Sequence, residues 1–144
     1  MCDQILEQLA SHAILYLSSR QIPKNAVAIF DIDQTLIDLK GNPTPIVKLF
    51  NFVKIKGIHP VIITARDATP ESVKQTQQHL QKFNIFGEIL MYFRPPEKMD
   101  LAYYKYCARK NVHERGFIPV LSIGDEYWDI GEYGGYGIKL PKCG

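Results

Sequence analysis

The chain has 144 residues, of which 46% are hydrophobic and 22% are charged, and its net charge is +2. This length predicts one domain with a single core, and the composition is ordinary for a soluble globular protein. So small a net charge does not indicate the broad basic surface of a nucleic-acid-binding protein. The three cysteines, Cys2, Cys107 and Cys143, are far apart and form no Cys-x-x-Cys pair. We therefore expect reduced thiols and no zinc site.

Residues 1–20 are predicted to form an amphipathic N-terminal helix that packs on the domain. Apolar residues recur at helical spacing from Ile5 to Leu17. Asp3 and Glu7 come early and no basic stretch precedes them, which argues against a signal peptide. No apolar run approaches the ~20 residues that a membrane-spanning helix needs. We expect an intracellular, cytoplasmic protein that has no membrane partner.

After residue 20, short apolar runs alternate with segments of helical spacing. Strands are predicted at about residues 26–30, 60–64, 88–93, 117–123 and 136–140. Helices are predicted from residue 46 to about 56, from 70 to about 84 and from 97 to 111, with a short helical turn at 126–132. This alternation implies right-handed crossovers and a parallel sheet. We expect an α/β fold, a single Rossmann-like domain over residues 1–144, with a parallel sheet of about five strands flanked by helices.

Polar side chains end or follow the first four predicted strands. They are Asp31 and Asp33 after the first strand, Thr64 at the end of the second, Lys98 after the third, and Asp125 with Asp129 after the fourth. The carboxyl ends of parallel strands share one edge of the sheet, so we expect these groups to converge there. Four carboxylates at one edge are costly without a cation, which indicates a metal site.

Each of these residues also has a simpler interpretation. Aspartates after a strand often cap helices or form turns. Taken alone, Thr64 is interpreted as a hydroxyl at a strand end and Lys98 as a solvated lysine at a helix start. Lys105 competes with Lys98 as the lysine that balances charge at the site. Arg66 is interpreted as a loop residue, and contact with a substrate is its alternative role. The glycine-rich stretch 131–137 lacks the context and the GK[ST] ending of a Walker motif, so we interpret it as a tight connection.

The order of these motifs resembles that of the haloacid dehalogenase (HAD) superfamily, specifically its phosphatase branch and the acid-phosphatase-like subfamily III. The matching stretches are Asp31-Ile-Asp33-Gln-Thr35, Thr64 after Val-Ile-Ile, Lys98, and Gly124-Asp125-x-x-x-Asp129. The resemblance spans roughly residues 26–129. Gln34 stands where many members of the superfamily have glycine. The resemblance implies a HAD-like fold and a phosphoric monoester hydrolase.

The chemistry of these residues suits a Mg²⁺-dependent phosphatase. A carboxylate can attack an anionic phosphomonoester only when the repulsion is cancelled, and Mg²⁺ held by hard oxygen ligands does this. Asp31 is the expected nucleophile, which forms an aspartyl-phosphate intermediate. Asp33 is expected to protonate the leaving oxygen and then to activate water, help that is typically worth ~10²–10⁴-fold.

The remaining residues are assigned to the metal and to the phosphoryl group. Asp125 is expected to complete the Mg²⁺ site together with Asp31, and Asp129 is a ligand or supports one. The resemblance implies that Asp33 adds its backbone carbonyl to the metal. Thr64 and Lys98 are counted as catalytic residues, because Thr64 would donate to a phosphoryl oxygen and Lys98 would balance the charge of the nucleophile.

Short connections predict a domain without a cap. Only residues 38–45 are available after the first strand and only 94–96 after the third. An open site accepts a bulky phosphorylated substrate, such as a phosphoprotein, a nucleotide or a nucleic-acid end, or it is covered by a second copy in a homo-oligomer. Two alternatives to the phosphatase stay open at this point. They are a non-catalytic interaction module of the same fold and a phosphotransferase to an acceptor other than water.

Overall fold

The computed structural model of the protein describes residues 2–97 and 99–143. At its centre is a five-stranded parallel sheet with the strand order β3-β2-β1-β4-β5. The strands are β1 (Ala26–Phe30), β2 (His59–Asp67), β3 (Leu90–Arg94), β4 (Ile118–Gly124) and β5 (Tyr136–Lys139). The predicted α/β class and the five-stranded parallel sheet are therefore confirmed.

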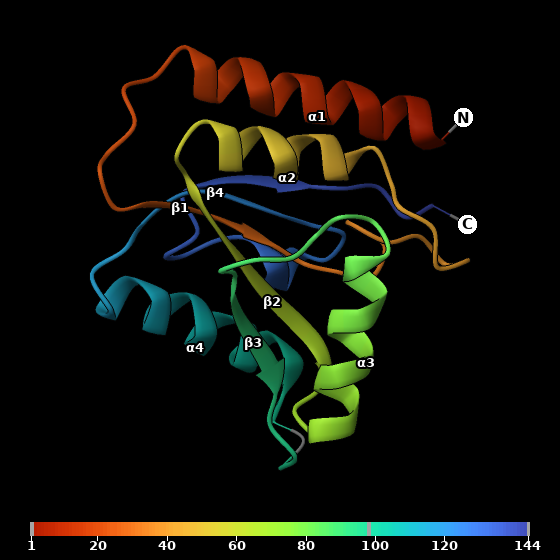
Figure 1. The fold of residues 1–144 in the computed structure, drawn as a ribbon. Helices are drawn as coiled ribbons and strands as arrows, with labels where there is room; N and C mark the ends of the chain where they lie inside the picture. The colour runs from red at the N-terminus through yellow and green to blue at the C-terminus, as the bar shows by residue number, and fades with distance from the viewer. Residues whose placement is uncertain (1, 98, 144) are drawn as a thin grey trace.

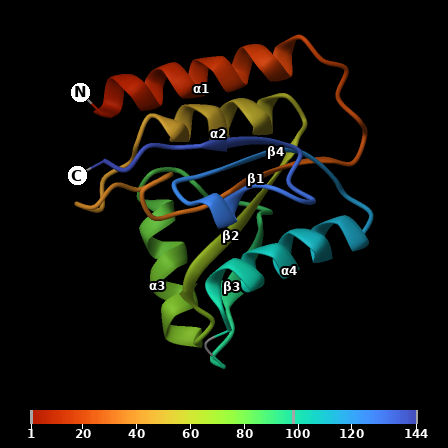
Figure 2. The same cartoon turned by 180° about the vertical axis from the view of Figure 1, so that it is seen from behind.

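Helices cover both faces of this sheet (Figure 1). They are α1 (Cys2–Ser18), α2 (Ile46–Ile55), α3 (Pro70–Gln81) and α4 (Leu101–Glu114), with a single 3-10 turn, η1 (Tyr127–Asp129). Helices α1, α2 and α3 share one hydrophobic core with the sheet, and α4 forms a second core on the opposite face. Figure 2, the view from behind, shows α1 and α2 side by side above the sheet and α4 below it. Within residues 2–97 and 99–143, no helix is both long and apolar enough to cross a membrane.

Strand β1 lies between β2 and β4, and all five of its residues are buried. Side chains of a strand alternate between the two faces of its sheet. Ala28 and Phe30 accordingly pack in the core under α1 and α2, whereas Val27 and Ile29 pack against α4. Burial on both faces explains why β1 is an unbroken apolar run. Full burial of a side chain such as Phe30 contributes roughly 1.5–3 kcal/mol.

The strand order reverses between β1 and β4. The chain runs from β1 outward through β2 to β3, and then returns to build β4 and β5 on the other side. At such a switch point the connections that leave the two strands diverge, which opens a crevice at their carboxyl ends. Asp31 follows β1 and Asp125 follows β4. The topology therefore directs both acids to this crevice.

Helix α4 begins four residues later than the sequence pattern predicts, at Leu101 instead of residue 97. The carboxylate of Asp100 accepts a hydrogen bond from the backbone N–H of Tyr103 at 3.0 Å, so Asp100 is the N-cap that sets this boundary. The start of α3 agrees with the expectation, since Thr69 accepts from the N–H of Ser72 at 3.2 Å. The helical turn expected at 126–132 is shorter and consists of η1 alone.

Two connections at the carboxyl edge are short and carry no cap in the described residues. Residues 31–45, after β1, contain only isolated bridges that pair Ile37 with Asp33 and Pro43. Residues 95–97, 99 and 100, after β3, contain no helix or strand. The edge that carries the acids is therefore not covered by an inserted domain in the part of the chain that is described.

The cysteines differ from the expectation of three reduced thiols. Cys2, the first residue of α1, is bonded to Cys143, and their Cα atoms lie 5.9 Å apart. Cys107 remains a thiol. A separation of 141 positions hides this pair in the sequence, because only the fold brings the start of α1 to the segment that follows β5.

Candidate active site

Three acidic side chains converge at the crevice between β1 and β4. Asp31, Asp125 and Asp129 each offer a carboxylate oxygen, and these oxygens all lie within 4.8 Å of one another. Their exposed fractions are 9%, 4% and 5%. They come from the end of β1, the end of β4 and the 3-10 turn η1, so three separate elements build one cluster.

Lys105 reaches this cluster from helix α4. Its ammonium nitrogen, Nζ, lies 3.0 Å from Oδ1 of Asp31 and 2.6 Å from Oδ1 of Asp129. The third hydrogen bond goes to the backbone carbonyl of Ile63 at 2.7 Å. The lysine side chain is buried, and all three of its N–H bonds are used. Its position is therefore fixed between two carboxylates.

Burial governs the ionisation of this cluster. Burial raises the pKa of Asp31 to about 7, although Lys105 opposes the rise and Asp129 adds to it. Burial likewise raises the pKa of Asp129, again against the attraction of Lys105. Burial lowers the pKa of Lys105, but the two carboxylates outweigh this effect, so its pKa is raised overall. The lysine is thus held as a cation, while Asp31 exchanges its proton near neutral pH.

The donor set fits a hard divalent cation. Three carboxylates face one buried ammonium, so the fully ionised cluster carries an excess of negative charge. Clustered carboxylate oxygens are the ligands that Mg²⁺ and Ca²⁺ prefer. A cation of this kind would be held by Asp31, Asp125 and Asp129, and it would offset the cost of burying their charges.

Asp33 lies apart from this cluster, at a more exposed position. Its side chain is 57% exposed, and both of its carboxylate oxygens accept hydrogen bonds from Arg66, at 3.0 Å from Nε and 2.7 Å from Nη2. Arg66 also donates to Oγ1 of Thr76 at 3.3 Å. The fork of the guanidinium therefore orients the Asp33 carboxylate.

Thr64 is fully buried near the end of β2. Its Oγ1 accepts a hydrogen bond from the backbone N–H of Arg66 at 3.1 Å. Its carbonyl accepts one from the hydroxyl of Tyr104 at 2.7 Å, which links β2 to helix α4. Tyr104 and Lys105 are neighbours in α4, so this helix contacts both β2 and the acid cluster.

The turn that carries Asp33 depends on a left-handed residue. Gln34 has a φ of +60°, a conformation that glycine adopts without steric cost. The backbone N–H groups of Thr35, Leu36 and Ile37 then all point to the carbonyl of Ile32. This tight loop suits a glycine at position 34, and it carries Asp33 at an exposed position.

The turn that carries Asp129 packs closely on the end of β4. A Cβ atom built on Gly124 would meet Cβ of Asp129 at 2.3 Å. Oδ2 of Asp129 accepts a hydrogen bond from the backbone N–H of Glu126 at 3.0 Å. Glycine at position 124 thus leaves the space that Asp129 occupies beside Asp125.

Arg109 supports this turn from α4, one helical turn after Lys105. It is buried, and it donates to the carbonyl of Trp128 at 2.5 Å and to that of Glu132 at 2.9 Å. Burial lowers the pKa of Arg109 from its usual value, and the negative charge of Asp129 opposes this lowering. Helix α4 therefore contacts the acid cluster directly and also anchors the loop that holds Asp129.

The structure brings together only part of the predicted residue set. Asp31, Asp125 and Asp129 meet, whereas Asp33 and Thr64 are joined to each other through Arg66. Lys98 lies outside the described residues. The contacts of Arg109 were missed, although Lys105 and Arg109 interrupt the apolar, buried stripe of α4, which is a signal that the sequence carried.

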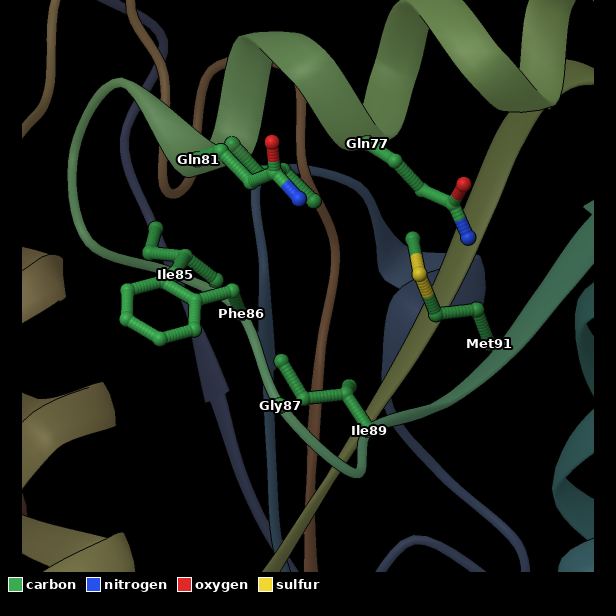
Figure 3. Close-up of a pocket in the computed structure, with 8 residues that line it drawn as sticks. Gln77, Gln81, Ile85, Phe86, Gly87, Ile89 and Met91 are labelled. Carbon is green, nitrogen blue, oxygen red and sulfur yellow. The ribbon is translucent and has the colours of Figure 1, made fainter.

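A separate hollow lies between α3 and β3, as Figure 3 shows. Its volume is about 210 Å³. Its wall consists of Gln77, Leu80, Gln81, Ile85, Phe86, Gly87, Ile89 and Met91. None of the predicted site residues belongs to this wall, and it offers no ionisable group. The hollow is therefore distinct from the acid cluster.

A protein-family model matches most of the chain. The family model described as "HAD superfamily, subfamily IIIB (Acid phosphatase)" matches residues 39–142. This range includes Thr64, Lys105, Asp125 and Asp129, and it begins after Asp33. No curated protein matches the chain.

Proposed function

Because the chain belongs to the HAD superfamily, subfamily IIIB of acid phosphatases, we propose that it is a Mg²⁺-dependent phosphatase that hydrolyses phosphomonoesters through an aspartyl-phosphate intermediate. One observation carries this proposal. The buried ammonium of Lys105 contacts Asp31 inside a cluster of three carboxylates. Such a cluster combines a nucleophile with the positive charge and the metal ligands that an anionic substrate requires.

Asp31 is the proposed nucleophile. One of its oxygens attacks phosphorus in line with the leaving oxygen, a P–O bond to Asp31 forms, and the P–O bond to the alcohol breaks. Asp31 must be ionised to attack, and its pKa of about 7 in the metal-free protein is too high for full ionisation at neutral pH. Mg²⁺, when it is bound, would favour the ionised carboxylate and reduce its repulsion with phosphate oxygens.

Asp33 is the proposed general acid and base. Its exposed carboxyl lies two residues after Asp31, and we infer that the leaving group departs on its side. It would give a proton to the leaving oxygen and then take one from the water that attacks the aspartyl-phosphate. Arg66 orients this carboxylate through two hydrogen bonds.

Lys105 and Thr64 are the proposed groups that balance and orient the phosphoryl group. Lys105 already neutralises part of the charge on Asp31 and would do the same for the intermediate formed there. The Thr64 hydroxyl accepts from the N–H of Arg66, which leaves its own hydrogen available for a phosphoryl oxygen. Lys98, which the motif order suggested for the charge-balancing role, remains the alternative to Lys105.

The open edge favours a bulky substrate. In the described residues neither connection beside the acid cluster contains a helix or strand that could cover it. We propose that the substrate is a phosphoprotein, a nucleotide or a nucleic-acid end. A homo-oligomer in which a second copy covers the site is the alternative, which the molecular mass in solution would reveal.

The decisive experiment uses p-nitrophenyl phosphate with Mg²⁺ and three variants. Asp31→Asn should lose phosphate release by at least about a thousandfold, because it lacks the nucleophile. Asp33→Asn should release one equivalent of p-nitrophenol and then stall as a phosphorylated protein. p-Nitrophenolate leaves without a proton from Asp33, but in this variant the water that attacks the aspartyl-phosphate lacks its general base. Asp67→Asn, which alters an exposed acid at the end of β2, is the matched control and should stay active.

The outcomes separate the candidate functions. If the Asp31→Asn variant hydrolysed the substrate at the wild-type rate, the aspartyl-phosphate route would be ruled out. Mg²⁺ binding without turnover on a broad panel of phosphomonoesters would instead favour an interaction module of the same fold. Faster p-nitrophenol release with added alcohols, without a matching rise in phosphate, would identify a phosphotransferase.

A further inference from the structure

The segment that follows β5 runs beside the end of β4 and brings a second lysine to Asp125 of the acid cluster. The backbone N–H of Leu140 donates to the carbonyl of Gly124 at 2.7 Å, which holds this segment beside the end of β4. Two residues later, Nζ of Lys142 lies 3.0 Å from Oδ2 of Asp125 and also contacts the carboxylate of Glu126. Lys142 thus binds an oxygen of a carboxylate assigned above to the metal.

The next residue fixes the segment from its other side. Cys143 is bonded to Cys2 of helix α1, and it lines a small hollow together with Gln34 of the Asp33 turn. Lys142 therefore lies between a backbone hydrogen bond at Leu140 and a disulfide at Cys143. Both ends of the chain run to the same side of the molecule in Figures 1 and 2.

This double attachment makes the Lys142–Asp125 pair unlike an ordinary surface ion pair. An exposed pair gains little, since two long side chains must be ordered and water screens their charges. Here the backbone on both sides of Lys142 is already fixed. In addition, the side chain of Asp125 is only 6% exposed, although that of Lys142 is 53% exposed. The ammonium is thus held against a carboxylate that water screens poorly.

We propose that Lys142 competes with the divalent cation for Asp125, and that the Cys2–Cys143 disulfide maintains this competition. The inference rests on the metal site of the proposed function. A cation that binds Asp125 must either displace the ammonium or bind beside a like charge. Loss of the Lys142 charge, or release of the segment from α1, therefore strengthens Mg²⁺ binding.

The test is calorimetric titration of protein treated with EDTA, with MgCl₂ alone as the ligand. Lys142→Gln should lower the dissociation constant for Mg²⁺ by about tenfold, the size expected for removal of one partly screened like charge. Lys139→Gln is the matched control. It changes the net charge by the same amount as Lys142→Gln, but the ammonium of Lys139 lies over the ring of Tyr127. Its dissociation constant should stay within about twofold of the wild-type value.

The role of the disulfide is tested by a double-mutant cycle. The Cys2→Ser/Cys143→Ser protein should also bind Mg²⁺ more tightly, and addition of Lys142→Gln to it should bring little further gain. Wild-type protein reduced with dithiothreitol gives the same comparison if the serine variant does not fold. In that reaction each cysteine sulfur gains one electron and one proton, and the two thiols of dithiothreitol close into a cyclic disulfide.

The outcomes distinguish this inference from the proposed function. Equal Mg²⁺ affinity in wild-type and Lys142→Gln proteins overturns the competition while the metal site stands. Weaker binding in Lys142→Gln also overturns it and makes Lys142 a supporting residue. A wild-type protein that binds no Mg²⁺ removes the metal site of the proposed function and this inference with it.

Discussion

Nζ of Lys105 lies 3.0 Å from Oδ1 of Asp31, although the two residues are 74 positions apart. The same ammonium contacts Asp129 at 2.6 Å, so one side chain of α4 connects the end of β1 to the turn after β4. Strands β1 and β4 are neighbours in the sheet, and the strand order reverses between them. Lys105 therefore links the parts of the chain that form the acid cluster.

Substitution of Lys105 by methionine should abolish most of the activity and lower stability. Methionine keeps much of the packing but leaves Asp31 and Asp129 buried without their cation. Loss of one partner of a buried pair typically costs about 3–5 kcal/mol, and loss of one stabilising donor typically lowers kcat by ~10²–10³-fold. Urea denaturation at pH 8 and turnover of p-nitrophenyl phosphate measure the two effects. Mg²⁺ should restore part of the stability.

The neighbouring lysines provide the comparison. Lys110→Met changes a partly exposed lysine of the same helix, and it should leave both quantities nearly unchanged. Lys98→Met tests the alternative assignment. Activity that falls with Lys98→Met and survives Lys105→Met would transfer the charge-balancing role to Lys98.

Substitution of Gly124 by alanine should displace Asp129. The added Cβ would lie 2.3 Å from Cβ of Asp129, an atom that cannot move without its backbone. We expect activity to fall by at least about tenfold, because a shift of about 1 Å at a catalytic group can cost 10²-fold. Gly116→Ala is the control. Nothing lies within 4 Å of its Cβ, although its φ of +93° makes alanine costly. Gly116→Ala should lower the melting temperature but not kcat, so equal loss of kcat in both variants would contradict the steric argument.

The fold could be predicted from the sequence because its signals are local. The unbroken apolar run of β1 and the alternation of strands and helices each occupy few consecutive residues. The start of α4 was predicted too early, since Asp100 was not recognised as its N-cap. Boundaries of this kind depend on a single side-chain hydrogen bond, which composition and periodicity do not reveal.

The site was predictable where a side chain follows a strand directly, or, like Asp129, lies four residues after such a residue. Asp31 and Asp125 follow strands directly, so topology alone brings them together. Lys105 reaches the cluster from the second turn of a helix, and Lys142 does so from a segment attached through a disulfide. Their contacts depend on how α4 and the segment after β5 pack on the sheet. Neither contact leaves a fixed spacing in the sequence.

Binding of Mg²⁺ should weaken as the pH falls below 7. The pKa of Asp31 is about 7 because of burial, and its carboxyl must lose the proton before it can serve as a ligand. The ionised fraction of Asp31 is about one half at pH 7 and about one tenth at pH 6. The apparent affinity for Mg²⁺ should therefore be about fivefold weaker at pH 6 than at pH 7. Calorimetric titrations in buffers with different ionisation enthalpies measure the affinity and the proton released. An affinity that does not change between pH 6 and pH 8 would contradict the raised pKa.

Stability of the metal-free protein should fall as the pH rises from 5 to 8. An unfolded Asp31 loses its proton near 3.8, whereas the folded protein retains it until about pH 7, so the folded state binds more protons between these values. The stability that this proton contributes is fully present below pH 3.8 and is lost as the pH rises through 7, and the raised pKa of Asp129 acts in the same direction. We expect a loss of about 2–3 kcal/mol in the free energy of unfolding, measured by urea denaturation in EDTA. Asp31→Asn should flatten the dependence, Asp67→Asn should retain it, and saturating Mg²⁺ should remove it. Parallel profiles for the wild-type and Asp31→Asn proteins would show that another group causes the dependence.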